Sequence, residues 1–401
     1  MRYNSFLKKL DRVFGIALMA LLYPFKFLRV RSVKGSRRIL LIKFAAIGDT
    51  VLLIPAIRSL KMSAGGADLD FLCTSVNYGF LKDVPYISRL YTLNLSSLRS
   101  YFSLIRIFRK NRYDLVVDFE QWLRLSSIIA FLSGARRIMG FKTAGQHKHL
   151  LFDGYVKHSS SCHEKNKFLA LAAAAGGAPD SGKLEHFITA EGRNKVDMIF
   201  SKYGLSGNKS LVSVNPGADL PRQLHPSVYA AAGRYMADKY GFKTVLTGGP
   251  GDKAMCAEIA SGIGQTSVNL AGLFEICEMP EVYSRMLFVL CNNAGGLHLS
   301  CAACTPVIAF HGPTNPLLWG PDCANSIVVS TRKSCAPCLY LGFEYACSSP
   351  DCMESIDAAD ALGAVDRMAS FLDIKFIVIY FKTMLVENFC KLSLRRQTIV
   401  S

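Results

Sequence analysis

Two successive series of apolar, strand-like runs and helical patterns constrain the fold of this chain most strongly. Short apolar runs that alternate with helices are typical of parallel strands in βαβ units. We therefore predict an α/β protein with two doubly wound, Rossmann-like domains that face a cleft. The strand-like runs are residues 38–44, 69–74 and 115–119 in the first series, and 211–214, 244–247, 287–291 and 307–310 in the second.

The division between the two series predicts the domain boundaries. A polar stretch, a helical pattern and a turn at residues 204–210 separate them, and 401 residues are enough for two sizeable cores. We predict an N-terminal domain at 37–200 and a C-terminal domain at 201–354, the latter ending in a Cys-rich segment. Residues 1–36 are predicted to be a basic amphipathic segment, and 355–401 a helix with a basic, apolar tail.

The basic charge of the chain favours an anionic partner, which could be nucleic acid, a membrane or a phosphorylated substrate. The formal net charge is +17, and residues 1–38 contribute +9 through ten Lys and Arg against one acidic residue. Residues 371–401 contribute +3 through five basic and two acidic residues, which leaves +5 for the body. No nucleic-acid-binding signature is present, so most of the excess is assigned to a membrane surface.

The apolar residues near the N-terminus have the pattern of an interfacial helix. Val13 to Phe25 is a run of thirteen uncharged residues, which is too short to span a bilayer comfortably. Phe6, Leu10, Val13, Phe14, Ala17 and Leu21 recur at helical spacing, with basic residues off that stripe. This predicts a helix that lies on an anionic leaflet. A helix packed on the body of the protein is the alternative, and residues 376–381 could be a second membrane contact.

The loops that follow the strands carry the candidate chemistry. Gly48 and Asp49 lie between a strand and a helix, where Asp49 could be a reactive carboxylate or simply a helix cap. Gly-rich turns surround Gly217 and Gly249, and such turns suit phosphates because backbone N–H groups converge there. Neither turn matches a P-loop or a G-x-G-x-x-G fingerprint.

The segment 292–299 is the most informative of these loops. Two glycines at a helix start, Gly295 and Gly296, offer N–H donors to a diphosphate. His298 lies in the same turn and could add a donor, although a lone histidine is as often structural.

Four motifs in order carry a family resemblance. Residues 39–61 have the pattern of a strand, a Gly-Asp loop and a helix with an internal proline. Residues 222–226 resemble a basic-x-Trp-Pro stretch, with Leu224 in place of Trp. Residues 292–298 resemble Asn-Asp-x-Gly-x-x-His, and 305–316 resemble the Thr-Pro and Gly-Pro-Thr-x-Pro segment that follows it. From about residue 38 to 370 the chain resembles family 9 glycosyltransferases, the ADP-heptose:lipopolysaccharide heptosyltransferases and their relatives.

The resemblance implies a GT-B fold, in which the domain at 37–200 is the acceptor side and the domain at 201–354 binds the nucleotide sugar. It also implies an inverting, metal-independent sugar transfer that needs no cofactor. Asp49 would be the general base and Arg222 would stabilise the donor diphosphate. The expected acceptor-binding residues are Glu120, Arg124 and His163. The expected donor-binding residues are Gly48, Gly217, Gly249, Asp252, Asn293, Ala294, Gly295, Gly296 and His298.

The resemblance also implies the partners and the location of the protein. The donor would be ADP-heptose or a similar nucleotide sugar, and the acceptor a lipopolysaccharide core or related lipid-linked saccharide. The location would be cytoplasmic, peripheral on the inner face of the bacterial inner membrane. Asn293 stands where the family usually has Asp, which removes a negative charge and leaves the donor open. A non-catalytic nucleotide-sugar-binding or scaffold protein at the membrane is the alternative function.

Four cysteines near the end of the second domain form a separate feature. Their spacing could provide a structural zinc site or an iron–sulfur cluster, but it is not that of a standard zinc ribbon. Buried or adjacent free thiols are the alternative interpretation. The residues are Cys335, Cys338, Cys347 and Cys352.

Overall fold

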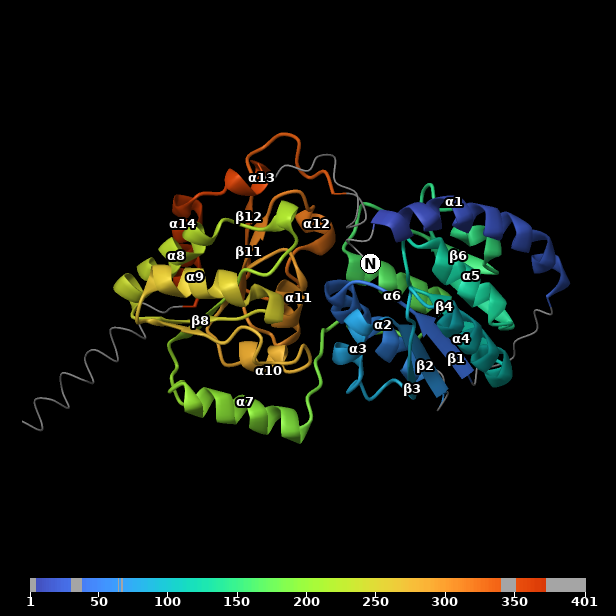
Figure 1. Cartoon of the computed structure of the whole chain (residues 1–401), viewed down its shortest axis with the longest axis horizontal. Helices are drawn as coiled ribbons and strands as arrows, with labels where there is room; N and C mark the ends of the chain where they lie inside the picture. The colour runs from blue at the N-terminus through green and yellow to red at the C-terminus, as the bar shows by residue number, and fades with distance from the viewer. Residues whose placement is uncertain (1–4, 30–37, 64, 66–67, 340–350, 373–401) are drawn as a thin grey trace, which may run out of the picture.

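The computed structural model describes residues 5–29, 38–63, 65, 68–339 and 351–372. Two α/β domains lie side by side, with the N-terminal domain at the right of Figure 1 and the C-terminal domain at the left. Each contains a six-stranded sheet whose paired strands are all parallel. The predicted fold class, with two Rossmann-like doubly wound domains, is confirmed.

The N-terminal sheet has the strand order β3-β2-β1-β4-β5-β6. Alternate side chains of β1 enter two different hydrophobic clusters, Ile39 and Leu41 on one face and Leu40 and Ile42 on the other. Because both faces are covered, the strand is a continuous apolar run rather than an alternating one. The strands are β1 (Arg38–Ile42), β2 (Asp68–Cys73), β3 (Arg89–Thr92), β4 (Leu115–Asp118), β5 (Arg137–Lys142) and β6 (Gly154–Lys157).

Helices cover both faces of this sheet. Side chains of α2 and α6 pack in the cluster that contains Ile39, and those of α4 and α5 in the cluster that contains Leu40. The α-helices are α2 (Ile47–Ser63), α3 (Ser75–Leu81), α4 (Leu98–Asn111), α5 (Arg124–Leu132) and α6 (Glu164–Ala174), with a 3₁₀ turn η2 (Lys148–Leu151).

The C-terminal sheet has the order β12-β11-β10-β7-β8-β9. Its strands are β7 (Leu211–Asn215), β8 (Lys243–Leu246), β9 (Ser267–Asn269), β10 (Val289–Asn292), β11 (Val307–His311) and β12 (Ile327–Ser330). Its helices are α8 (Pro226–Tyr240), α9 (Lys253–Ile263), α10 (Met279–Tyr283), α11 (Gly295–Ala302), α12 (Pro316–Trp319), α13 (Asp351–Glu354) and α14 (Ala358–Phe371), with 3₁₀ turns η3 (Leu220–Arg222) and η4 (Pro250–Asp252).

The helix before β7 packs on the second sheet, although most of it lies before the predicted boundary between residues 200 and 201. Val196 and Phe200 of α7 (Ala190–Lys202) share a cluster with Leu211 of β7 and Val245 of β8. In Figure 1 this helix lies below the C-terminal domain. The division after residue 200 therefore stays a prediction, and the packing places α7 with the C-terminal core.

Both sheets have a central strand at which the direction of winding reverses. In the first sheet β1 lies between β2 and β4, and in the second β7 lies between β8 and β10. Ligands of doubly wound sheets bind outside the C-terminal strand ends at such switch points. The loops after β1, β7 and β10 are therefore where the fold places a site.

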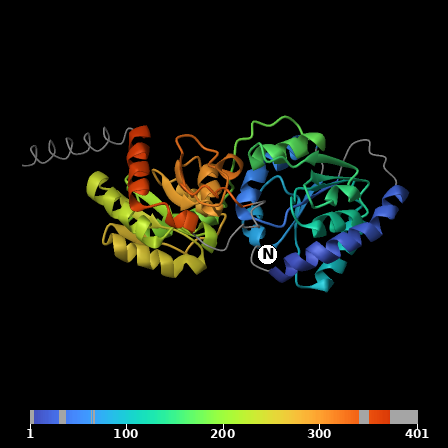
Figure 2. The ribbon, with the colours of Figure 1, turned by 90° about the horizontal axis from the view of Figure 1, so that it is seen from above.

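The N-terminal helix α1 (Ser5–Leu22) packs along the outside of α5, as Figure 2 shows from above. Its Asp11 carboxylate accepts the backbone N–H groups of Arg124 (3.1 Å) and Leu125 (2.9 Å), and so satisfies donors at the start of α5. A 3₁₀ turn, η1 (Tyr23–Leu28), follows. Among the described residues, no helix is long and apolar enough to cross a membrane.

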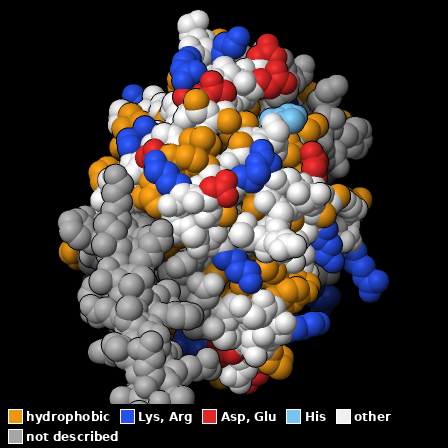
Figure 3. Space-filling model, turned by 90° about the vertical axis from the view of Figure 1, so that its left-hand side faces the viewer, with side chains coloured by type: hydrophobic (Ala, Val, Ile, Leu, Met, Phe, Trp, Pro, Cys, Tyr) orange, Lys and Arg blue, Asp and Glu red, His pale blue; other side chains and the backbone are white. Residues whose placement is uncertain are grey.

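The outer end of the C-terminal domain is mixed in charge. Figure 3 shows Lys and Arg side chains beside Asp and Glu side chains among hydrophobic ones on this face. The mixture agrees with the small net charge of the chain between its two basic ends.

Candidate active site

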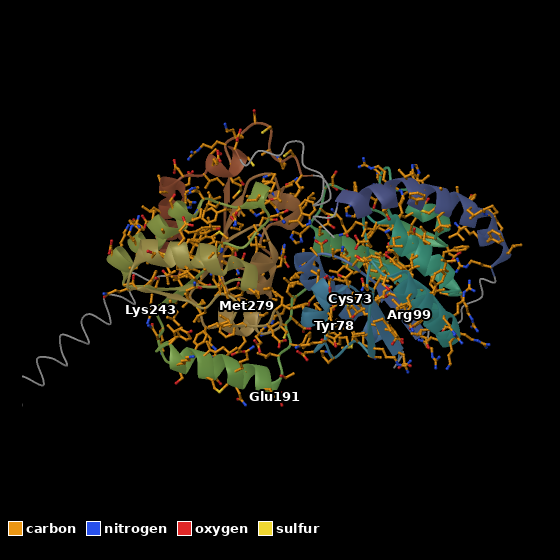
Figure 4. All side chains as sticks on the ribbon, in the orientation of Figure 1. Cys73, Tyr78, Arg99, Glu191, Lys243 and Met279 are labelled. Atoms are coloured by element: carbon orange, nitrogen blue, oxygen red, sulfur yellow. The ribbon has the colours of Figure 1, made fainter. Side chains whose placement is uncertain are left out.

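A cavity of about 500 Å³ lies between the two domains, at the C-terminal ends of β1, β7 and β10. Tyr78 and Met279, labelled in Figure 4, lie on the facing sides of the two domains, and Met279 lines the cavity. All the residues predicted for catalysis and donor binding line it as well: Gly48, Asp49, Gly217, Arg222, Gly249, Asp252, Asn293, Ala294, Gly295, Gly296 and His298.

Gly48 packs against His298 across this cavity. The start of α2 meets α11, and a Cβ atom on Gly48 would lie 2.5 Å from Cδ2 of His298. Such a distance excludes any side chain at position 48 without movement of the buried imidazole. Gly48 therefore permits the domains to approach, and a direct contact of Gly48 with the donor stays a prediction.

Asp49 follows in the first turn of α2, with its side chain 15% exposed on the cavity wall. Its Oδ2 lies 3.2 Å from Nζ of Lys43, a residue that is fully buried just after β1. Asp49 is therefore a carboxylate that is open to a ligand on one side and paired with a cation on the other. Sequence reasoning missed Lys43, and the available signal was a lysine that directly ends an apolar strand.

Arg222 connects two of the loops that form the opposite wall. Its guanidinium donates from Nη1 to the backbone oxygen of Asn293 (2.8 Å) and is paired with Asp219. Only 5% of Arg222 is exposed. The positive charge is thus held rigidly beside the loop after β10.

Asp252 organises the Gly-rich loops on the same wall. Its Oδ2 accepts the N–H of Gly249 at 2.7 Å. Cβ atoms on Gly217 and Gly248 would lie 2.7 and 2.8 Å from the nearest atom of Asp252, so the absence of side chains there makes room for this residue. These glycines are thus explained by the packing of Asp252, and their contacts with a nucleoside stay a prediction.

The N-terminal end of α11 makes this wall suitable for binding an anion. Ala294, the N-cap residue, makes no side-chain cap, and Gly295 and Gly296 form the first turn beside the cavity. The first N–H groups of a helix lack partners within the helix and carry partial positive charge. They can bind a diphosphate without any side-chain contribution.

The amide of Asn293 acts as a hydrogen-bond donor inside the C-terminal domain. Its Nδ2 donates to the backbone oxygen of Trp319 (2.7 Å) and lies 3.2 Å from Nε2 of His311. Burial, together with the nearby charge of Arg222, lowers the pKa of His311 to about 4, so its ring is neutral at pH 7. The neutral ring accepts at Nε2 and can donate from Nδ1 to Thr314 Oγ1 at 3.0 Å. An ionised Asp could make neither donation.

The structure does not bring the three predicted acceptor residues to the cavity wall. Glu120 is fully buried and accepts the N–H of Phe44 (3.1 Å). Arg124 donates to the backbone oxygen of Gly145 (2.9 Å) and faces Asp11, with 5% of the residue exposed. Glu120 is paired with Lys43 and Arg124 with Asp11, both of which are far away in sequence. The role of these residues in acceptor binding stays a prediction.

His163 has a structural partner across the domain boundary. Its Nε2 lies 3.1 Å from the backbone oxygen of Gly320 and its Nδ1 accepts the N–H of Lys165. Burial lowers the pKa of His163, which favours the neutral ring. Next to it, Lys165 pairs with Asp322 at 2.5 Å. The residues around His163 thus join α6 to the C-terminal domain.

The four cysteines do not gather in the described part of the chain. Cys335 is exposed, Cys338 is half-buried and Cys352 is buried, whereas Cys347 lies outside the described residues. Within the described ranges no group of three or more potential ligands could hold a metal ion. The predicted structural metal therefore has no support from these residues.

Two Rossmann-like domains that face a cavity, with an uncapped helix start on one wall and a carboxylate on the other, have the architecture of a GT-B glycosyltransferase. The model of glycosyltransferase family 9 (heptosyltransferase) matches residues 101–347. Lipopolysaccharide heptosyltransferase 3 of Escherichia coli K12 is 26% identical over 304 residues, which cover 70% of this chain and 84% of the relative. The chain belongs to glycosyltransferase family 9, and it is an enzyme of that class.

Solved structures agree with this fold. A family 9 glycosyltransferase from Veillonella parvula superposes with a TM-score of 0.72 at 19% identity, covering 84% of this chain and 98% of that one. The ADP-heptose lipopolysaccharide heptosyltransferase II of E. coli gives a TM-score of 0.66 at 19% identity, covering 82% and 98%. Both comparisons confirm the GT-B architecture.

Because the amide of Asn293 donates a hydrogen bond to the neutral ring of His311, we predict that Asn293→Asp changes the pH dependence of stability. The pKa of His311 is about 4 in the folded protein, whereas its ordinary value is 6.5. Between pH 4 and pH 6.5 the unfolded chain therefore binds more protons than the folded protein. The contribution of His311 to stability is therefore lost as pH falls from about 6.5 to about 4. A carboxylate at 293 favours the imidazolium and raises this pKa, so thermal melts of N293D will show a smaller loss over that window.

Asn208→Asp is the matched control for this measurement. Asn208 is exposed, and its Oδ1 accepts the N–H of Ser210, a bond that Asp retains. N208D should follow the native stability curve. A curve for N293D that is parallel to the native one would contradict the placement of residue 293 beside a buried, neutral His311 ring.

Proposed function

We propose that this enzyme transfers a heptose with inversion from ADP-heptose, or a similar nucleotide sugar, to a lipopolysaccharide core or related glycolipid. The observation that carries the proposal is the placement of Asp49 in the same cavity as Arg222 and the uncapped start of α11. A base and an anion site on opposite walls are what a displacement at a sugar carbon requires. The sugar and acceptor are supported by the names of the relatives.

In the proposed reaction, Asp49 takes the proton of the acceptor hydroxyl as its oxygen attacks the anomeric carbon of the donor. The new C–O bond forms on the face opposite the diphosphate while the old C–O bond breaks, so the configuration inverts. The bonding electrons leave with the diphosphate, and the carboxylate becomes a carboxylic acid. A positioned base of this kind contributes about 10²–10⁴-fold to the rate.

The leaving diphosphate gains negative charge as the bond breaks. The first N–H groups of α11 and the guanidinium of Arg222 lie on the wall where we place this group. Fixed dipoles and charges that need no rearrangement stabilise such a transition state strongly. We infer that these groups of the chain perform the task, which supports the metal-independent part of the proposal. Gly249 and Asp252 lie farther along the same wall, where the nucleoside would lie.

A non-catalytic nucleotide-sugar-binding protein is the second candidate. Asn293 in place of the family Asp favours it, since a lost carboxylate can mean lost activity. The partners of Asn293 weaken that argument, because its amide is matched to two acceptors and its position is structurally satisfied. Turnover decides between the two functions.

Asp49→Asn tests the proposed base. The amide retains size and polarity but cannot take the proton, so we expect turnover to fall by about 10²-fold or more with little change in donor affinity. Sugar transfer from ADP-heptose to a heptose-deficient lipopolysaccharide acceptor measures the first quantity, and calorimetric titration with ADP measures the second. Asp68→Asn, an exposed residue at the opposite end of the sheet, should leave both unchanged. Native turnover in D49N would contradict the base assignment.

The proposed location includes attachment to a membrane surface through the N-terminal helix. The described part of α1 and the turn η1 present large apolar side chains outward, while Met19 and Asp11 face the body of the protein. An apolar outer face beside basic residues is the pattern of a helix that lies in a lipid headgroup layer. We propose that this face contacts the cytoplasmic leaflet. The outward residues are Val13, Phe14, Ile16, Leu18, Leu21, Phe25, Phe27 and Leu28.

The variant Phe14→Ser/Leu21→Ser/Phe27→Ser tests this surface. The three side chains are 64%, 66% and 68% exposed, so their loss should not disturb the packing of α1. We expect binding to phosphatidylglycerol-containing vesicles in a sedimentation assay to fall about tenfold or more, since apolar burial drives the contact. The control Met198→Ser/Phe371→Ser removes equally exposed side chains from the C-terminal domain. Equal binding by the two variants would contradict the assignment.

A further inference from the structure

Lys43 is the one buried ammonium among the described residues that touches the proposed base. It directly follows β1, and its side chain is fully buried. Its Nζ donates to Oε1 of Gln121 (2.5 Å) and lies 3.2 Å from Oδ2 of Asp49 and 3.4 Å from Oε2 of Glu120. The fold brings these groups together because β1 and β4 are neighbours at the switch point of the sheet.

The partners of Lys43 form hydrogen bonds with further buried residues. Oε2 of Glu120 also accepts the N–H of Phe44, and Nε2 of Gln121 donates to Oε2 of Glu164 at 3.2 Å. Glu164 is held in turn by Lys167 (2.6 Å) and by His158 (3.1 Å). A network of buried groups therefore lies under the floor of the cavity.

The charges of this network are fixed by its geometry. Burial by itself would lower the pKa of Lys43, but Glu120 and Asp49 outweigh it and raise that pKa above its ordinary value. Burial also acts to raise the pKa of Glu164, but hydrogen bonds from His158 and Lys167 reverse this and lower it to about 2. Lys43 is thus a permanent cation and Glu164 a permanent anion at neutral pH.

Stability does not account for this arrangement. Replacing a buried ion pair by apolar side chains of similar volume is often neutral or stabilising, so a core gains little from one. Within this network Asp49 alone lines the cavity, whereas Lys43, Glu120, Gln121 and Glu164 do not. The network therefore supports one functional group that faces the ligand.

We propose that Lys43 is a positioning residue for Asp49, an inference that rests on the proposed role of Asp49 as base. Lys43 holds Oδ2, which fixes the plane of the carboxylate and leaves Oδ1 to take the proton. Its positive charge also lies directly beside the carboxylate, with Nζ 3.2 Å from Oδ2.

The second carboxylate completes the arrangement. When Asp49 accepts the proton of the acceptor hydroxyl it becomes neutral, and Lys43 would then be a buried cation without a counter-ion. Oε2 of Glu120 lies 3.4 Å from the same ammonium, so Lys43 faces a second carboxylate at every stage of the turnover. This explains why one ammonium lies between two carboxylates.

The double variant Lys43→Met/Glu120→Gln tests the proposal without leaving a lone buried charge beside Asp49. We expect the acidic limb of the kcat–pH profile to move to higher pH by about one unit or more, because the carboxylate loses its cation. At a pH below the shifted limb, kcat will fall about tenfold, since one pKa unit is a factor of ten. The affinity for ADP, measured by calorimetric titration, will stay native because Lys43 does not line the cavity.

Glu120→Gln alone provides a second measurement in the opposite direction. Lys43 would then have Asp49 as its one carboxylate partner in this group, so the acidic limb of the kcat–pH profile should move to lower pH. The other charged groups that face this region are the same in both variants and cannot produce opposite shifts. They are Glu164, His158, Lys167, Lys148 and Asp118 in the N-terminal domain and His298, Arg222, Asp219 and Asp252 across the cavity.

The outcomes separate this inference from the proposed function. If the folded double variant binds ADP and keeps the native pH profile while D49N is inactive, the role of Lys43 is wrong and the base assignment stands. If the double variant does not fold, a native pH profile for E120Q would overturn the role of Lys43 in the same way. If D49N itself turns over normally, the proposed base fails and the inference fails with it.

Discussion

The contact between Gly48 and His298 is the interaction on which the rest of the site depends. It lets the starts of α2 and α11 meet, because a Cβ atom at position 48 would lie 2.5 Å from the imidazole. Asp49 directly follows Gly48, and Gly295 and Gly296 shortly precede His298 in the same helix. This close approach, together with the contacts of His163 and Lys165 with the C-terminal domain, fixes the separation between the proposed base and the proposed anion site. Interiors pack at crystal-like density, so such a contact transmits position accurately.

The two walls of the cavity carry different charged groups. On the N-terminal side, a buried ammonium lies behind one exposed carboxylate. On the C-terminal side, Arg222 is held by Asp219 and by the backbone of Asn293, beside a helix start that needs a partner. Each of these fixed charges has a counter-ion within the protein, so no large rearrangement is required when a nucleotide sugar binds. Preorganisation of this kind is the main source of transition-state stabilisation in many enzymes.

Much of the fold could be predicted from sequence because its central strands are buried on both faces and are continuous apolar runs. The loops after β1, β7 and β10 could be found for the same reason, and they do line the cavity. The edge strands β3, β6, β9 and β12 were missed, since they are short and partly exposed. The strand β5 was missed as well, although its middle residues are buried. Glu120 and Arg124 were predicted in the acceptor site, but Lys43 and Asp11, far away in sequence, take up their charges. Local patterns do not reveal such pairs.

A crystal structure with a non-transferable ADP-heptose analogue would show most directly whether both walls act on one nucleotide sugar. We expect the diphosphate at the first turn of α11 beside Arg222, and the anomeric carbon facing Asp49 across the cavity. A diphosphate bound elsewhere, or a sugar turned away from Asp49 in the closed cavity, would contradict the proposed arrangement.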